Sequence, residues 1–163
     1  MADQEMERFK AEMNQRAVLF RRLVDRLGGE VLDVIEEYTI EQARNRLQAA
    51  DLQERNLETV MELLWDQMGE GTEFTVEEWT PEVLRLRVTR CMIADEMRQL
   101  GAADVGGAFY CAYDHGFCQG LNPGIRFTRT KTLMQGEDCC NHTYELGRSP
   151  GSVEVSELEP SWK

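Results

Sequence analysis

The hydrophobic pattern of the chain changes its period near residue 72, and this change limits the possible folds more than any other feature. The first 70 residues contain no proline, and apolar side chains recur there every three or four residues, the spacing of a helix that buries one face. From Thr72 onward apolar side chains alternate with polar ones, the spacing of a half-buried strand. Helices followed by strands predict an α+β domain.

Three helices are expected in the first half of the chain. Residues 6–27 form the longest amphipathic pattern, which stops at the two glycines that follow, and residues 31–47 form a second. Asp51 with Glu54 three residues later resembles an N-terminal capping pair, which predicts a third helix over residues 57–68.

The second half is expected to contain two β-hairpins with helices between them. Alternation and turn residues predict strands at 72–79 and 84–88, helices at 92–100 and 105–119, and strands at 125–133 and 137–146. In this scheme Asp104 caps the second of these helices and Gly120 ends it. The predicted fold class is therefore α+β, with a helical N-terminal half packed on a small antiparallel sheet built from the two hairpins.

Length and charge set further limits. The 163 residues suit one domain over 1–146, with a helical part at 1–70 and a sheet and site-bearing part at 71–146. Residues 147–163 are rich in Ser, Pro, Gly and Glu and are expected to form a loose C-terminal tail. A net charge of -12 argues against a nucleic-acid partner, which would need a basic surface.

The chain is expected to be a soluble cytoplasmic protein. No apolar run approaches the roughly 18 residues that a membrane span needs, and the N-terminus carries neither a basic nor an apolar signal region. The five cysteines are an odd number, and a reducing cytosol would keep them as thiols. We therefore expect no membrane association and no disulfide scaffold.

Reactive and anion-binding side chains concentrate in residues 114–140, which hold three carboxylates, one imidazole, three thiols and three cations. On the helix expected at this point, spacings of three, four and seven residues place four side chains on one face, namely Cys111, Asp114, His115 and Cys118. Taken singly, each of them could equally be a core or core-edge residue. Their grouping favours a site.

The last expected strand carries a thiol and an imidazole on the same face. Cys140 and His142 are two residues apart and project together, whereas Cys139 and Asn141 project to the other face. A thiol becomes a nucleophile when a base or a positive environment favours its thiolate, and His142 is placed to help. Simple packing beneath the helices is the alternative interpretation.

Three cations, Arg126, Arg129 and Lys131, fall within a stretch that contains no acidic residue. A guanidinium binds a carboxylate through two hydrogen bonds, so this stretch suits a carboxylate-bearing ligand. Strand alternation places Arg129 and Lys131 on the face of Phe127 and leaves Arg126 on the other. The alternative is that these cations are solvated side chains of an exposed strand.

Zinc is the metal that the histidines and cysteines would suit, but their spacing does not support a site. The chain has no Cys-x-x-Cys pair, and the adjacent Cys139 and Cys140 cannot both face one ion from a regular strand. Glycine-rich phosphate loops and the common hydrolase motifs are also missing from the sequence. We therefore expect neither a metal nor a cofactor.

Several short motifs resemble one known family. They are Cys111-Ala112-Tyr113-Asp114, Gly120-Leu121-Asn122-Pro123, Arg129-Thr130-Lys131-Thr132-Leu133 and Gly136-Glu137-Asp138-Cys139-Cys140. Together they resemble the signature of the L-2-amino-thiazoline-4-carboxylic acid hydrolase-like family over about residues 70–146. The resemblance implies a small cofactor-independent bacterial hydrolase that opens a five-membered ring containing sulfur and nitrogen and bearing a carboxylate. After the second thiol this chain has Asn141 and His142, where the family pattern has an aspartate and an aromatic residue.

Ring opening at a C=N carbon needs a nucleophile or an activated water, a proton donor for the leaving atom, and a cation for the carboxylate. We expect Cys140 as nucleophile, Asp114 as proton donor or water activator, and His142 as base. Arg129 is the expected carboxylate anchor. The other side chains expected to contact the substrate are Thr130, Thr132, Cys111, Asn122 and Lys131.

Two other functions are compatible with the sequence. A non-catalytic domain could bind a small molecule between its helices and its sheet and so control a partner. An oligomerisation module would explain the length of the first helix, since about 25 residues extend roughly 37 Å, further than one sheet face requires. We therefore also expect a homodimer, with a small-molecule carboxylate as the ligand.

Overall fold

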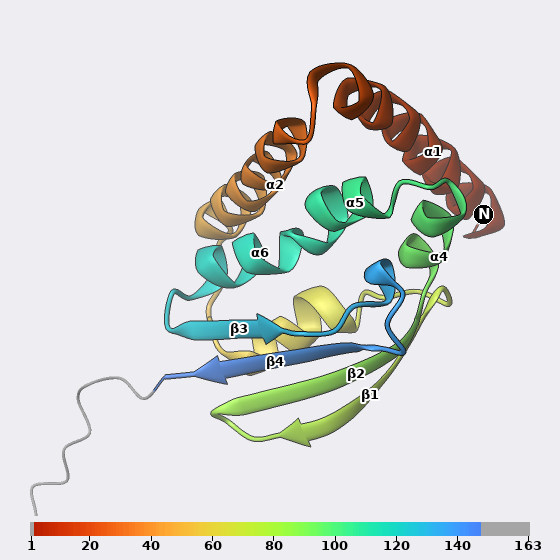
Figure 1. Ribbon diagram of the computed structural model, residues 1–163. Helices are drawn as coiled ribbons and strands as arrows, with labels where there is room; N and C mark the ends of the chain where they lie inside the picture. The colour runs from red at the N-terminus through yellow and green to blue at the C-terminus, as the bar shows by residue number, and fades with distance from the viewer. Residues whose placement is uncertain (1, 148–163) are drawn as a thin grey trace, which may run out of the picture.

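The structure is a computed structural model that describes residues 2–147 (Figure 1). Its elements are α1 (Ala2–Leu27), α2 (Glu30–Ala49), α3 (Leu57–Val60), η1 (Met61–Trp65), β1 (Thr72–Trp79), β2 (Val83–Cys91), α4 (Met92–Gln99), α5 (Ala103–Gly106), η2 (Gly107–Cys111), α6 (Tyr113–Leu121), β3 (Ile125–Arg129), η3 (Leu133–Gln135) and β4 (Cys140–Leu146). Both η1 and η2 are π-helical turns, and η3 is a 3-10 turn. None of the described helices is long and apolar enough to cross a membrane. Apart from Gly147, the predicted tail lies outside the described residues.

The sheet has four antiparallel strands in the order β1-β2-β4-β3. Both predicted hairpins are present, as β1–β2 and β3–β4, and they join through the pairing of β2 with β4. In Figure 1, α5 and α6 lie between the sheet and the two long helices α1 and α2. The predicted α+β fold is confirmed.

One face of the sheet forms the main core. Three buried residues of β2 pair in register with three buried residues of β4, and these pairs are Leu84–Tyr144, Leu86–His142 and Val88–Cys140. The residues between them in β2 include Arg85 and Arg87, which form ion pairs on the opposite face with Glu78 and Asp138. The alternation that predicted this strand is therefore the alternation between core and solvent.

The helix predicted at 105–119 differs from the structure at both ends. It begins two residues earlier, and the Asp104 carboxylate accepts hydrogen bonds from the Val105 backbone N–H and from Arg21 instead of capping the helix. At the other end Gly120 lies inside α6 and does not end it. Between these ends the π-helical turn η2 shifts the register of everything that follows.

Two glycines allow α6 to approach α2 closely. A Cβ atom at Gly116 would lie 2.2 Å from the Ile40 carbonyl oxygen, and one at Gly120 would lie 2.3 Å from the Arg44 carbonyl oxygen. Backbone atoms inside a packed helix have little freedom to move away, so this spacing requires glycine. Close helix contact, and not helix termination, explains Gly120.

The third helix and the last hairpin also differ from the sequence expectation. Asn56 caps the third helix by accepting a backbone N–H at 3.0 Å, so the predicted pair Asp51 and Glu54 does not cap it. β3 ends at Arg129, and residues 130–139 form a longer connection that contains η3. The predicted strand to residue 133 was therefore too long.

The apolar stripe of α1 is buried in part. Met13, Ala17 and Val24 are buried, whereas Leu27 is 66% exposed. Val18 is also among the exposed apolar residues of this helix. Contacts within one chain thus bury part of the stripe. The homodimer stays a prediction.

The α2–α6 contact can be tested with Gly120→Ala. The added methyl group would overpack the interface by about 1–3 kcal/mol, which corresponds to a melting temperature lower by roughly 3–10 °C. Gly107→Ala is the matched control, because a Cβ atom there meets nothing within 4 Å. Thermal unfolding followed by circular dichroism measures both variants. Equal melting temperatures for the two would contradict the close contact.

Candidate active site

A carboxylate, a guanidinium and an imidazole meet between α6 and the sheet. Arg129 Nη1 donates to Asp114 Oδ2 at 2.5 Å and lies 3.2 Å from His142 Nε2. His142 Nε2 is 3.4 Å from the same Asp114 oxygen. The three side chains are largely buried, with exposed fractions of 14% for Asp114, 11% for Arg129 and 6% for His142.

The positions of these three groups follow from the backbone elements that carry them. Arg129 is the register partner of His142 across β3 and β4. Asp114 lies in the first turn of α6, directly after the π-helical turn η2. Arg129 Nη2 also donates to the Cys111 carbonyl oxygen at 3.0 Å, and its guanidinium lies 5.5 Å from the centre of the Phe127 ring. The arginine therefore ties η2 to the sheet.

The pairing keeps Asp114 ionised. Burial alone would raise the pKa of Asp114, but the contacts with His142 and with the Arg129 charge outweigh burial and hold this pKa below its ordinary value. Burial alone would lower the pKa of Arg129, and the Asp114 charge reverses this and raises it. The two groups therefore form a lasting ion pair near neutral pH.

Of the two ring nitrogens of His142, Nε2 contacts this cluster and Nδ1 does not. Nε2 lies 3.2 Å from Arg129 Nη1 and 3.4 Å from Asp114 Oδ2, so it hydrogen-bonds within the cluster, as acceptor or as donor according to the tautomer of the ring. The buried Nδ1 has no hydrogen-bond partner among the described residues. Trp65 packs edge-on to the ring at a centroid distance of 4.8 Å and holds it in place. His142 Nδ1 is thus free to form a hydrogen bond with a ligand.

These groups line a small inner cavity of about 110 Å³. Three thiols share its wall, those of Cys91, Cys111 and Cys140. Burial raises the pKa of Cys91, and it raises the pKa of Cys111 to about 12, so both remain protonated thiols at neutral pH. The Cys140 sulfur accepts the Leu133 backbone N–H at 3.2 Å, which fixes its position in the cavity wall.

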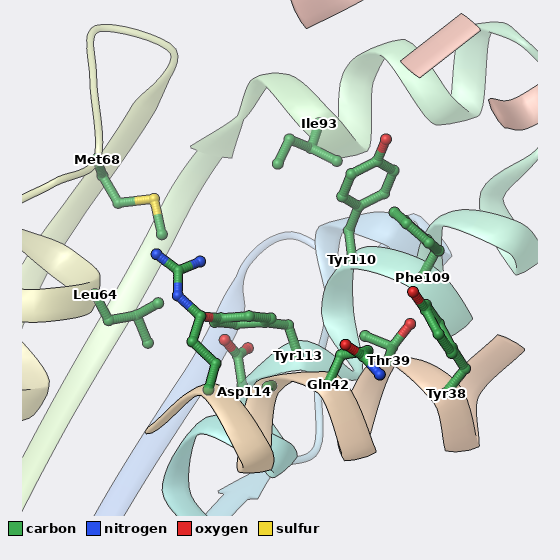
Figure 2. Close-up of a pocket in the computed structure, with 12 residues that line it drawn as sticks. Tyr38, Thr39, Gln42, Leu64, Met68, Ile93, Phe109, Tyr110, Tyr113 and Asp114 are labelled. Atoms are coloured by element: carbon green, nitrogen blue, oxygen red, sulfur yellow. The ribbon is translucent and has the colours of Figure 1, made fainter. Parts of the chain in front are cut away.

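A larger outer pocket of about 580 Å³ adjoins the inner cavity. The two share four lining residues, Met68, Ile93, Tyr110 and Asp114. In Figure 2, α2 contributes Thr39 and Gln42 to one side of the outer pocket, and Tyr110 and Phe109 face them from η2. Asp114 therefore belongs to both spaces and lies where a ligand in the outer pocket would reach the buried cluster.

The structure brings some of the predicted site residues together and leaves others outside. Asp114, Arg129, Cys111, Cys140 and His142 all line the inner cavity. Thr132 is near it only through Cys140, since its hydroxyl oxygen lies 3.7 Å from the thiol sulfur.

Three predicted substrate contacts have structural partners instead. Asn122 ends α6, where its side chain donates to the Arg55 carbonyl oxygen at 2.8 Å. Thr130 is exposed and accepts a hydrogen bond from Asn141 at 2.8 Å. Lys131 is exposed and pairs with Asp138 at 3.0 Å, because β3 has already ended and strand alternation no longer applies.

The remaining two side chains of the predicted helix stripe also lie outside the cavity lining. His115 is exposed and packs edge-on to Phe127 at a centroid distance of 4.9 Å. Cys118 is buried in the main core, where burial strongly raises the pKa of its thiol. Among the described residues no group of three or more His, Cys, Asp and Glu side chains is arranged to hold a metal ion.

Sequence reasoning missed the residues that complete the site from other elements. Trp65 ends the π-helical turn η1 and lines the inner cavity, and Cys91 ends β2. Tyr110 lines both spaces from η2. A buried tryptophan at the end of a helix was a visible signal, but nothing in its spacing tied it to Asp114.

A comparison with protein families agrees with the resemblance seen in the motifs. The family model described as L-2-amino-thiazoline-4-carboxylic acid hydrolase matches residues 6–144. The chain belongs to this family. No curated protein matches the chain. The match to the hydrolase family extends over the helical half as well, so α2 lies within the matched residues.

The ion pair of this hydrolase-family protein can be tested with a double-mutant cycle. Arg129→Gln leaves the buried Asp114 carboxylate without its partner and should cost about 3–5 kcal/mol of unfolding free energy. Asp114→Asn combined with Arg129→Gln should cost less than the sum of the single changes, by about 1 kcal/mol or more. Urea unfolding gives all the values. Additive costs would show that the two side chains do not interact.

Arg126→Gln is the control for this cycle, because the Arg126 side chain is 73% exposed in its pair with Glu145. An exposed pair of this kind should contribute less than about 1 kcal/mol.

Acid should weaken the protein partly through Asp114. Its folded pKa is depressed, so its contribution to stability is complete above the unfolded pKa of about 3.9 and is lost as pH falls through the folded pKa. The difference in unfolding free energy between wild type and Asp114→Asn should therefore be constant above about pH 5 and shrink below about pH 4. Urea unfolding at a series of pH values measures it. A constant difference down to pH 3 would contradict the depressed pKa.

Proposed function

We propose that the protein is a hydrolase that opens a five-membered ring containing sulfur and nitrogen and bearing a carboxylate, through attack on the C=N carbon. The supporting observation is that Cys140 shares one buried cavity with the Asp114, Arg129 and His142 cluster. The family to which the chain belongs is named for such a substrate. Buried ionisable groups beside a ligand-sized pocket are typical of catalytic sites.

Cys140 is the proposed nucleophile. Its sulfur accepts the Leu133 backbone N–H, and the Arg129 guanidinium lines the same cavity. A cation in the surroundings is a feature that reactive cysteines share. A depressed pKa makes Asp114 a weak base. We therefore propose that Asp114 positions Arg129 and His142 and does not activate water.

The proposed reaction begins with addition of the Cys140 thiol across the C=N bond. The sulfur bonds to carbon, and the thiol proton goes to the ring nitrogen. The bond from this carbon to the ring sulfur then breaks, and the ring sulfur leaves as a thiol with the proton taken up by the nitrogen. Water hydrolyses the adduct and releases Cys140 as a thiol, so one water is consumed in total.

His142 has the proposed role of a hydrogen-bond donor in these steps. Its unpartnered Nδ1–H can donate to the ring nitrogen as that atom gains electron density. This proposal takes the tautomer with the ring proton on Nδ1, in which Nε2 accepts from Arg129, and it differs from the role of base expected from the sequence. Arg129 already donates to Asp114 through Nη1 and to the Cys111 carbonyl through Nη2, and its charge is matched by Asp114. Its proposed role is therefore electrostatic, and another cation is proposed to hold the substrate carboxylate.

A non-catalytic binding domain is the second candidate function. Apolar and aromatic side chains form much of the outer pocket, as they do in many binding sites for small molecules. Such a domain would bind the ring acid and leave it unchanged.

The proposed setting is the cytoplasm. All five cysteines are free in the structure, in keeping with a reducing compartment. A homodimer is proposed on the exposed apolar residues of the two long helices, which include Leu19, Leu27 and Val34. Light scattering at micromolar concentration measures the oligomeric state.

Covalent catalysis is tested by Cys140→Ser against Cys139→Ser. The first should lower turnover of 2-amino-thiazoline-4-carboxylate by about 1000-fold or more, since an alcohol is a far weaker nucleophile than a thiolate. The neighbouring Cys139 is absent from the cavity lining, so its variant should keep wild-type turnover. Ring opening is followed by NMR, and intact-protein mass spectrometry should detect the adduct on wild type only.

Full turnover in Cys140→Ser would contradict the covalent route and leave a water activated by Asp114, which Asp114→Asn then tests. Full turnover in both variants would show that the reaction occurs elsewhere. Binding without turnover in wild type would favour the second candidate function.

A further inference from the structure

The outer pocket is much larger than the ring acid named by the family. A cavity of about 150 Å³ is enough to hold a six-membered carbon ring. The inner cavity of about 110 Å³ is near this size, whereas the outer pocket adds about 580 Å³. A small heterocyclic acid at the buried cluster would leave most of the outer pocket unfilled.

One side of the outer pocket is aromatic and already held in place. Phe109 and Tyr110 pack edge-on to each other at a centroid distance of 5.1 Å. From α1, Phe20 packs on Phe109 at 5.4 Å, and Arg16 both lies over the Phe109 ring and donates to the Tyr110 hydroxyl at 3.3 Å. A rigid aromatic wall binds flat apolar groups without a large ordering cost.

The opposite side of the outer pocket is polar and comes from α2. Thr39, Gln42 and Arg46 are three and four residues apart, so they share one face of this helix. Thr39 is only 6% exposed, and its hydroxyl has no hydrogen-bond partner among the described residues. Figure 2 shows Thr39 and Gln42 pointing from α2 into the pocket. A buried hydroxyl without a partner is costly, and a ligand would remove that cost.

Arg46 supplies the positive charge on this side. It is the one cation among the described residues that line the outer pocket, and it forms no ion pair within the described part of the chain. Arg129 differs, since its charge is already matched by Asp114. In a chain with a net charge of -12, an anion needs such a local cation to bind.

We propose that the outer pocket is a specificity subsite for a substrate with an aromatic or bulky apolar substituent, whose carboxylate is held by Arg46. The substituent lies against Phe109 and Tyr110, the Gln42 amide binds the carboxylate edge beside Arg46, and the Thr39 hydroxyl hydrogen-bonds the ligand further along α2. This inference rests on the proposed function, since the reactive ring then lies against the inner cavity with Asp114 at the junction. The natural substrate is therefore larger than 2-amino-thiazoline-4-carboxylate.

Binding of aromatic analogues that resist ring opening tests the subsite without any turnover. The probes are 2-aminothiazole-4-carboxylate, its 5-phenyl derivative, and the methyl ester of the 5-phenyl compound. By isothermal titration calorimetry the 5-phenyl acid should bind wild type about 10-fold more tightly than the parent acid and about 10-fold more tightly than its ester.

Arg46→Gln should weaken binding of the 5-phenyl acid about 10-fold and leave the ester unchanged, because only the acid loses a charge partner. Arg44→Gln is the matched control, since this arginine lies on the same helix and is not among the pocket lining. Phe109→Leu should remove most of the advantage of the phenyl group while keeping the response to Arg46→Gln. Equal affinity for parent and 5-phenyl acids, or an unchanged affinity in Arg46→Gln, would overturn the proposal.

Failure of the subsite and failure of the hydrolase function give different results. If the subsite is wrong, the binding differences vanish while Cys140→Ser still abolishes ring opening. If the hydrolase function is wrong, wild type opens no ring while the binding differences between probes and between Arg46 and Arg44 variants persist.

Discussion

The ion pair between Asp114 and Arg129 is the interaction on which the arrangement of the site depends. It joins the first turn of α6 to the end of β3 in a largely buried position, and His142 of β4 completes it. A buried charge is tolerated only when an opposite charge neutralises it, so removing either side chain would leave the other as a destabilising unpaired charge. The helical layer and the sheet are thereby fixed relative to each other at the point where the two pocket spaces meet.

The same helix must also be held from its other side. Gly116 and Gly120 place α6 directly against the α2 backbone, and Arg55 donates to carbonyl oxygens near the C-terminal ends of both helices, including those of Leu47 and Leu121. α6 is thus clamped between α2 and the sheet. These backbone contacts hold in place the walls of the outer pocket that are formed by α2 and α6.

Periodicity predicted the parts of the fold that depend on one buried face. It identified α1, α2, the first hairpin and the shared face of Cys140 and His142, because burial on one side leaves a repeat in the sequence. Periodicity failed where contacts between distant parts of the chain determine the role of a residue. Gly120 looks like a helix stop from its neighbours alone, and only the approach of α2 reveals its use. Likewise nothing in the sequence indicated that the Asp114 carboxylate would neutralise the charge of Arg129.

The π-helical turns η1 and η2 give the site a dependence on chain length. A π turn is commonly understood as one residue inserted into an α-helix, and these two turns end at Trp65 and Cys111, both on the inner cavity wall. Deleting one residue from η2 would restore a regular helix and rotate everything after it by about 100°. Asp114 would then face away from Arg129 although no side chain of the cluster had changed. A one-residue deletion in η2 would therefore dismantle the site while every residue of the cluster remained in the sequence.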